Sequence, residues 1–192
     1  MRQLSTAKLD DAADDGTWTV VHETELLRTQ LGVSVCEQTV QLPDTTVVTD
    51  YLQITMPNYT TVLPVTCDGL IVCIRQYKHG IGSVALTLPG GAIESDEQPI
   101  ESARRELLEE TGYRCAIWQD LGEFVVGANQ GICKAHLYLA KDGRKICKAE
   151  SGDLEDMEIE LLDVEQLQHA LDSGQFPILS HSCAIALARN YI

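Results

Sequence analysis

The amino-acid sequence predicts one α/β or α+β domain in which a mixed sheet is flanked by a few helices. Several short segments alternate apolar and polar residues and are rich in β-branched side chains, as strands are, whereas fewer segments carry helical apolar spacing. No repeat or low-complexity linker divides the 192 residues, of which 44% are apolar and 22% charged. This length and composition are ordinary for one globular domain with a substantial core.

The N-terminal part is predicted to be an antiparallel β meander. Residues 1–16 are polar and acidic, so we expect them to be frayed. Three alternating segments follow, separated by breaks such as Leu42-Pro43-Asp44: residues 17–25, 31–41 and 46–56. We therefore assign residues 17–57 to a β meander and residues 58–192 to the main domain.

The main domain is predicted to hold the remaining strands and all of the helices. Asp68-Gly69 is expected to form a tight turn between two buried strands, because this dipeptide supplies the positive φ that such turns need. Strands are predicted at residues 60–66, 70–76, 83–88, 115–126, 132–139 and 157–162. Helices are predicted at residues 99–111, 164–173 and 178–190.

The charge balance argues against a sequence-independent nucleic-acid binder. The chain has 29 acidic and 14 basic residues, and its net charge of −15 repels phosphates at long range. A chain this acidic needs a bridging cation if it is to handle phosphates. No apolar run approaches the roughly 20 residues that a membrane span requires, so we expect no membrane partner.

The seven cysteines are odd in number and scattered, without a CxxC pair. Together with the lack of a signal peptide, this pattern predicts reduced thiols in a cytoplasmic protein. Most of the cysteines have apolar neighbours in the sequence, so we expect most of them to be small core residues. The five histidines are equally dispersed and give little support to a His-based metal site.

The predicted helix at residues 99–111 carries an acidic face. Pro99 near its start and Gly112 just past its end are typical of helix boundaries. At roughly 100° per residue, the side chains of Glu106, Glu109 and Glu110 fan over one sector about 100° wide. Ala103 and Leu107 point elsewhere and are available for the core.

Three carboxylates this close together repel one another and need compensation. Hard divalent cations provide it directly, and Mg²⁺ combines one or two carboxylates with substrate phosphates and waters. We expect Mg²⁺ or Mn²⁺ on this face, with the carbonyl of Gly90 in the preceding loop as a further ligand. The alternative is a solvated acidic helix face, which is the commoner fate of glutamates on helices.

The full spacing of this region favours the metal site. From Gly91 to Tyr113 the sequence follows the pattern G-x5-E-x7-R-E-U-x-E-E-x-G-U, in which U is apolar or aromatic. This stretch, preceded by Leu-Pro-Gly-Gly, resembles the signature of the Nudix hydrolases, which cleave a nucleoside diphosphate linked to another moiety. The resemblance is complete at every defined position.

The resemblance implies an α/β/α sandwich around a mixed sheet, and water attack on a phosphorus of a pyrophosphate. It implies that Gly90, Glu106, Glu109 and Glu110 hold the Mg²⁺ or Mn²⁺ and that Glu97 and Arg105 orient the helix carboxylates. Candidate catalytic carboxylates are Glu109 on the helix and Asp153 or Glu155 in a later loop. Glu150 and Asp156 in the same loop remain alternatives.

A weaker similarity, over most of the chain, links it to the ADP-ribose and nucleotide-sugar pyrophosphatases. It implies a two-fold homodimer joined through the N-terminal strands, and a substrate site that includes Arg75, Tyr77, Trp18 and Tyr51. Trp18 and Tyr77 have an alternative role as core aromatics. Members that act on ADP-ribose usually carry a proline in the loop after the signature helix, and residues 126–131 of this chain contain none.

The function expected from these patterns is metal-dependent hydrolysis of a nucleoside diphosphate sugar, with ADP-ribose as the first choice. The products would be a nucleoside monophosphate and a sugar phosphate. The alternatives are a Nudix hydrolase of nucleoside triphosphates or dinucleotides, and a Nudix-fold binding module without catalysis. Because Glu106, Glu109 and Glu110 are all present, the catalytic interpretation is favoured over the binding module.

Overall fold

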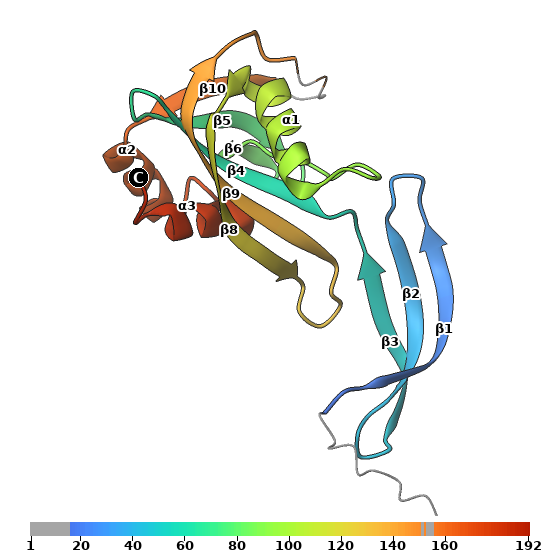
Figure 1. Cartoon of the computed structure of the whole chain (residues 1–192). Coiled ribbons are helices and arrows are strands. Elements are labelled where there is room, and N and C mark those ends of the chain that lie inside the picture. The colour runs from blue at the N-terminus through green and yellow to red at the C-terminus, as the bar shows by residue number, and fades with distance from the viewer. Residues whose placement is uncertain (1–15, 151, 153–155) are drawn as a thin grey trace, which may run out of the picture. The chain divides into compact units, whose positions relative to one another are not determined.

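The computed structural model of the chain describes residues 16–150, 152 and 156–192. It divides into two compact units, one ending at Thr55 and the other comprising Met56–Ile192 (Figure 1). The predicted fraying of the N-terminus concerns residues that, apart from Gly16, lie outside the described part. No helix in the described part has the length and apolarity needed to cross a bilayer.

The N-terminal unit is a three-stranded antiparallel sheet, as predicted. Its strands are β1 (Thr19–Arg28), β2 (Ser34–Gln41) and β3 (Val47–Thr55), in the spatial order β1-β2-β3. Every residue of β1 is exposed within the chain, including Val20, Val21, Leu26 and Leu27. A sheet of three strands with this much uncovered apolar surface gains little from its own core.

The second unit is built on one mixed sheet. Its strands are β4 (Tyr59–Thr66), β5 (Ile71–Lys78), β6 (Ser83–Thr87), β7 (Tyr113–Arg114), β8 (Ile117–Val126), β9 (Cys133–Lys145) and β10 (Met157–Leu162). The order is β10-β5-β4-β9-β7, with β6 paired to β5 and β8 paired to β9. The β4–β9 pair is parallel and the others are antiparallel. Strand β7 was not predicted, and β9 continues beyond the predicted residue 139.

Helices cover both faces of this sheet, which confirms the predicted sandwich (Figure 1). On one face, α1 (Pro99–Thr111) buries Ala103 and Leu107 in a cluster with Val62, Val72 and Tyr138. On the other face, α2 (Val164–Asp172) and α3 (Leu179–Ala188) pack in a cluster that includes Leu63, Cys73, Leu137 and Leu139. Neighbouring strand residues therefore alternate between the two cores, as a sheet covered on both faces requires.

Helix α1 begins and ends where the sequence predicts. Pro99 lies in its first turn, and Gly112 follows its end with φ 74°, donating its N–H to the Leu108 carbonyl. A Cβ on Gly112 would lie 2.3 Å from the carbonyl oxygen of Cys147, so this position requires glycine for space as well as for conformation. The carbonyl of Gly112 also accepts a bond from the Cys147 N–H, which ties the chain after β9 to this end of α1.

The loop before α1, residues 88–91, follows β6 and is hydrogen-bonded to β4. Strand β6 pairs with β5 up to Thr87, after which the chain crosses to β4. There the N–H of Val62 donates to the Pro89 carbonyl (2.8 Å) and that of Thr60 to the Gly91 carbonyl (2.9 Å). A Cβ on Gly90 would lie 2.1 Å from the Thr60 carbonyl oxygen, so only glycine permits this approach.

A buried histidine fixes the start of this loop. The Leu88 N–H donates to Nδ1 of His181 at 3.0 Å, and His181 lies in α3, on the opposite side of the sheet from α1. Burial, assisted by the charge of Lys78, lowers the pKa of His181 to about 3. The imidazole is therefore neutral, with its proton on Nε2 and Nδ1 free to accept.

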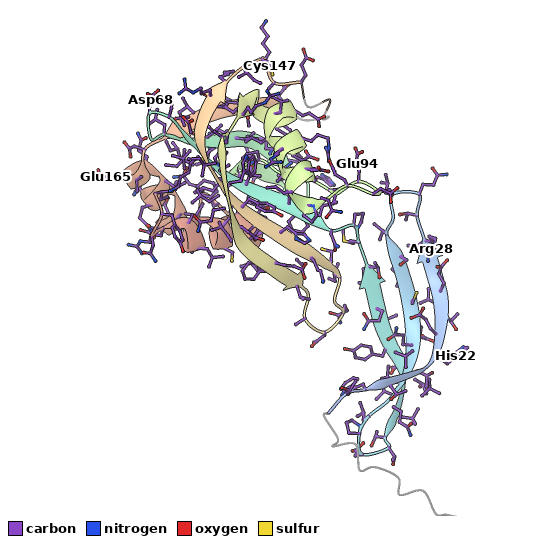
Figure 2. All side chains as sticks on the ribbon, viewed as in Figure 1. His22, Arg28, Asp68, Glu94, Cys147 and Glu165 are labelled. Atoms are coloured by element: carbon purple, nitrogen blue, oxygen red, sulfur yellow. The ribbon has the colours of Figure 1, made fainter. Side chains whose placement is uncertain are left out.

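The cysteines are free thiols, but fewer of them are core residues than predicted. Cys73, Cys115 and Cys133 are buried, Cys36 and Cys183 are half-buried, and Cys67 and Cys147 are exposed. Burial raises the pKa of Cys73 and of Cys115 to about 12. Cys67 lies in the turn between β4 and β5. Cys147, labelled in Figure 2, lies in the segment after β9. Neither thiol is part of a core.

Replacement of Leu107 by alanine tests the packing of α1. Its side chain is fully buried between α1 and the sheet, so Leu107→Ala should lower the free energy of unfolding by about 2–5 kcal/mol. Leu179→Ala is the matched control, because Leu179 is 85% exposed and should change stability by less than about 0.5 kcal/mol. Urea unfolding followed by circular dichroism measures both; equal effects would contradict the packing described here.

The neutral state of His181 predicts a pH dependence of stability. The folded-state pKa of about 3 lies below the ordinary 6.5, so between these values the unfolded chain binds the extra proton and stability falls as the pH falls. His181→Gln keeps an acceptor for the Leu88 N–H and cannot titrate. From pH 6.5 to 5, the wild type should lose about 1–2 kcal/mol more than this variant. Parallel pH profiles for the two proteins would show that His181 is not held neutral.

Candidate active site

The acidic face of α1 meets the loop that runs along β4. The N–H of Gly90 donates to Oε2 of Glu110 at 2.8 Å, and Glu110 is only 5% exposed. The helix carboxylate and the loop backbone are thus joined directly. Because the other side of the loop is bonded to Thr60 and Val62, this hydrogen bond also fixes α1 against the start of β4.

Gly91 leaves room for the second carboxylate of this face. A Cβ at Gly91 would lie 2.5 Å from Oε1 and 2.6 Å from Cδ of Glu106. The Glu106 carboxylate therefore lies directly against the loop backbone. Any side chain at position 91 would have to move this carboxylate.

Arg105 connects the carboxylates with one another. Its guanidinium makes two bonds to Glu97, both 2.9 Å, and further bonds to Glu106 Oε1 at 2.7 Å and Glu109 Oε2 at 3.3 Å. It also donates to the Ala92 carbonyl at 3.2 Å. Paired bonds from the planar fork of an arginine to a carboxylate fix both groups in orientation.

The loop before α1 holds Glu97 in place for this contact. The N–H of Glu94, labelled in Figure 2, donates to Glu97 Oε2 at 3.2 Å. The hydrogen bonds that Arg105 donates to Glu97 are the main cause of a lowered pKa for Glu97 and of a raised pKa for Arg105. The pair is therefore charged over the whole physiological range of pH.

Three of the four predicted metal ligands lie close together, and the chemistry of all four suits a hard divalent cation. Gly90, Glu106 and Glu110 lie in one contact region, while Glu109, on the same helix face, has a side chain that is 45% exposed. Within residues 16–150, 152 and 156–192, no three His, Cys, Asp or Glu side chains are already arranged as a metal site. Arg105 bonds to Glu106 and Glu109, so those two would exchange these bonds for a cation. Carboxylate and carbonyl oxygens are the ligands that Mg²⁺ and Mn²⁺ prefer.

The candidate catalytic carboxylates beyond the helix occupy different places. The N–H of Glu150 donates to the Glu109 carbonyl at 2.8 Å, so Glu150 lies beside the last turns of α1. Asp153 and Glu155 lie outside the described residues. Asp156 comes just before β10 and lines a separate cleft.

Two predicted substrate residues, Arg75 and Tyr77, line that cleft of about 480 Å³. Its described walls come from β5, β6 and the start of β10 and include no residue of α1. Both Oε atoms of Glu160 accept bonds from Arg75, so the charge of this arginine is already compensated. Tyr77 is 39% exposed, so its alternative role as a core aromatic is wrong.

The other two predicted substrate residues, Trp18 and Tyr51, belong to the N-terminal unit. Their rings meet edge to face with centroids 5.6 Å apart. Trp18 is 48% exposed within the chain, so it too is not a core aromatic. Its predicted role in substrate binding stays a prediction.

Sequence reasoning missed two residues that position the site. His181 holds the loop, yet it is distant in sequence and no local pattern marks it. Glu160, the partner of Arg75, follows from the alternation of β10 only once that strand is known to pair with β5. Both depend on long-range pairing.

Comparison with known proteins gives one family. The NUDIX domain model matches residues 57–181. The methanol dehydrogenase activator of Bacillus methanolicus is 33% identical over 59% of this chain and 62% of its own length. The ADP-ribose pyrophosphatase of Bacillus subtilis (strain 168) is 30% identical over 45% of this chain and 46% of its own length. The chain thus matches about half to three fifths of the length of these relatives.

A solved structure described as an ADP compounds hydrolase has the same fold. It superposes with a TM-score of 0.77 over 91% of this chain and 93% of its own, at 20% sequence identity. The family model covers more than half of the chain, and it includes α1, the Gly90–Gly91 loop and Arg105. The chain belongs to the Nudix family.

Proposed function

We propose that the protein hydrolyses the pyrophosphate bond of a nucleoside diphosphate sugar in a reaction that depends on Mg²⁺ or Mn²⁺. The observation that carries this proposal is the contact between Glu110 and Gly90, with Glu106 against Gly91. Together they gather carboxylate oxygens and loop backbone at one place. In a chain with a net charge of −15, such a place is where a cation can bind and a diphosphate can follow.

Glu106, Glu109, Glu110 and the Gly90 carbonyl would hold the cations. When bound, they neutralise the diphosphate, lower the pKa of a water and stabilise charge on the leaving phosphate. The contribution of the chain is positional: Glu97 holds Arg105, and Arg105 bonds to Glu106 and Glu109 until a cation replaces it. The backbone bond to Gly90 leaves Glu110 little freedom to turn away.

Glu109 and Glu150 are the described candidates for accepting a proton from the attacking water. Glu109 is the most solvent-accessible of the three helix carboxylates, and the backbone of Glu150 is bonded to the last turns of α1. Proximity supports both roles, because a general base must come within hydrogen-bond reach of the water. Asp153 and Glu155, which lie outside the described residues, remain candidates for accepting this proton.

ADP-ribose is our first choice of substrate. The name of the Bacillus subtilis relative supports it, as does the cleft formed by Arg75, Tyr77 and Asp156. The loop between β8 and β9 is closed by bonds from Gly131 to Gly127 and from Ile132 to Val126. The Ile132 carbonyl accepts a hydrogen bond from the Met56 N–H. Met56 precedes Thr60 by four residues, about 13 Å of extended chain, and Thr60 is bonded to the Gly90–Gly91 loop. The loop between β8 and β9 is therefore suited to contact the non-nucleoside half of the substrate.

We further propose a cytoplasmic homodimer in which the N-terminal strands meet. The uncovered apolar residues of β1 support this assembly, because edges and apolar faces of this kind are usually paired or covered. Trp18 and Tyr51 would then serve the partner's site. The seven free thiols support the cytoplasmic location.

Removal of one carboxylate charge tests the metal site. Glu106→Gln and Glu110→Gln keep the side-chain shape and should each lower kcat by about 100-fold or more, roughly 2.7 kcal/mol of barrier, at saturating Mg²⁺. Glu101→Gln is the matched control, since Glu101 is exposed in the first turn of the same helix and should leave kcat within about twofold. Near-normal turnover of either test variant would contradict the assignment.

A substrate comparison tests the choice of nucleotide sugar. With Mg²⁺ or Mn²⁺, kcat/KM for ADP-ribose should exceed that for nucleoside triphosphates and dinucleotides by at least about tenfold, roughly 1.4 kcal/mol in transition-state binding. A triphosphate preferred by that factor would overturn the substrate while leaving a hydrolase. Failure to release any phosphorylated product from the whole set would instead favour a binding module.

A further inference from the structure

A basic pocket lies on the side of α1 opposite Glu106. It has a volume of about 400 Å³ and is lined by Arg104, Arg105, Leu107, Leu108, Arg114, Cys115, Ala116 and Trp118. At 100° per residue, Arg104 and Leu108 lie about 160° from Glu106, so this pocket faces away from the acidic side of α1. Its volume falls in the range of small-molecule sites.

Two arginines of this pocket are left without a carboxylate. In the part of the chain that the structure describes, neither Arg104 nor Arg114 forms an ion pair, although acidic residues outnumber basic ones by two to one. Arg104 lies instead over the ring of Trp118, 5.6 Å from its centroid. The indole is fixed by a bond from Nε1 to the Cys115 carbonyl (3.1 Å).

The sheet places a further arginine beside Arg114, outside the lining of the pocket. In the β7–β9 pair, Arg114 lies directly opposite Arg144, whose only ion pair in the described residues is a 3.6 Å contact with Asp142. Like charges directly opposite each other in an antiparallel pair are unfavourable. An anion bound beside Arg114 would offset this repulsion, so the pairing is consistent with an anionic ligand.

We propose that this pocket binds a small molecule that carries a phosphate and an aromatic ring, such as a nucleoside monophosphate. Arg104 and Arg114 hold the phosphate through charge-assisted hydrogen bonds, which are the strong ones. The aromatic ring stacks on the Arg104–Trp118 pair, and Leu108 supplies an apolar wall. A long nucleic acid is disfavoured because the net charge of the chain is −15.

Calorimetric titration of the full chain with AMP in EDTA tests the proposal without using the metal site. AMP should bind at one site per chain, at least about tenfold more tightly than adenosine or inorganic phosphate, because each lacks one of the two recognised groups. Arg104→Gln/Arg114→Gln should weaken AMP binding by about tenfold or more. The control pair Arg28→Gln/Arg189→Gln removes the same charge elsewhere and should change binding by less than about twofold.

Tryptophan fluorescence locates the ligand. The chain has two tryptophans, so AMP should change the emission of the wild type but not that of Trp118→Phe, in which only Trp18 emits. AMP binding that both double variants retain, or that leaves Trp118 emission unchanged, would overturn the proposal. A four-nucleotide RNA that binds more than tenfold tighter than AMP would overturn the small-molecule assignment. These outcomes do not depend on whether the chain hydrolyses a nucleotide sugar.

Discussion

The hydrogen bond from the Gly90 N–H to Glu110 is the interaction on which the candidate active site depends. It joins a helix on one face of the sheet to a loop that lies within the plane of the sheet. The loop can reach this position because β6 pairs with β5, whereas the residues after it pair with β4. Glycine is required there, since any Cβ at position 90 would overlap the backbone of Thr60.

The same loop is held from the opposite face of the sheet. His181 accepts the Leu88 N–H, so α3 and α1 anchor the two ends of a segment only three residues long. Both anchors are buried: one acceptor is the neutral imidazole of His181, whose protonation on Nδ1 would remove the bond, and the other is the side chain of Glu110. Helix α1 thus has two sides of opposite charge: Glu106, Glu109 and Glu110 lie on one, and Arg104 lines the basic pocket on the other.

The sequence predicts the local structure well and the long-range pairing poorly. The bounds of α1 follow from Pro99 and Gly112, and the acidic face follows from helical spacing alone. In contrast, the parallel β4–β9 pair, the short β7 and the partnership of Arg75 with Glu160 arise from contacts between segments distant in sequence. The prediction that most cysteines lie in a core was also wrong. Apolar neighbours in the sequence do not bury a residue that lies in a turn, such as Cys67.

The most direct test of the metal site is the affinity for Mn²⁺ of a variant that leaves every carboxylate in place. Gly91→Ala puts a methyl group 2.5 Å from Glu106 Oε1, at the end of a side chain, so the carboxylate must move. Calorimetric titration should show Mn²⁺ binding weakened by about tenfold or more, with unchanged circular dichroism. Wild-type affinity for Mn²⁺ in this variant would contradict the claim that Glu106 and the loop together form the metal site.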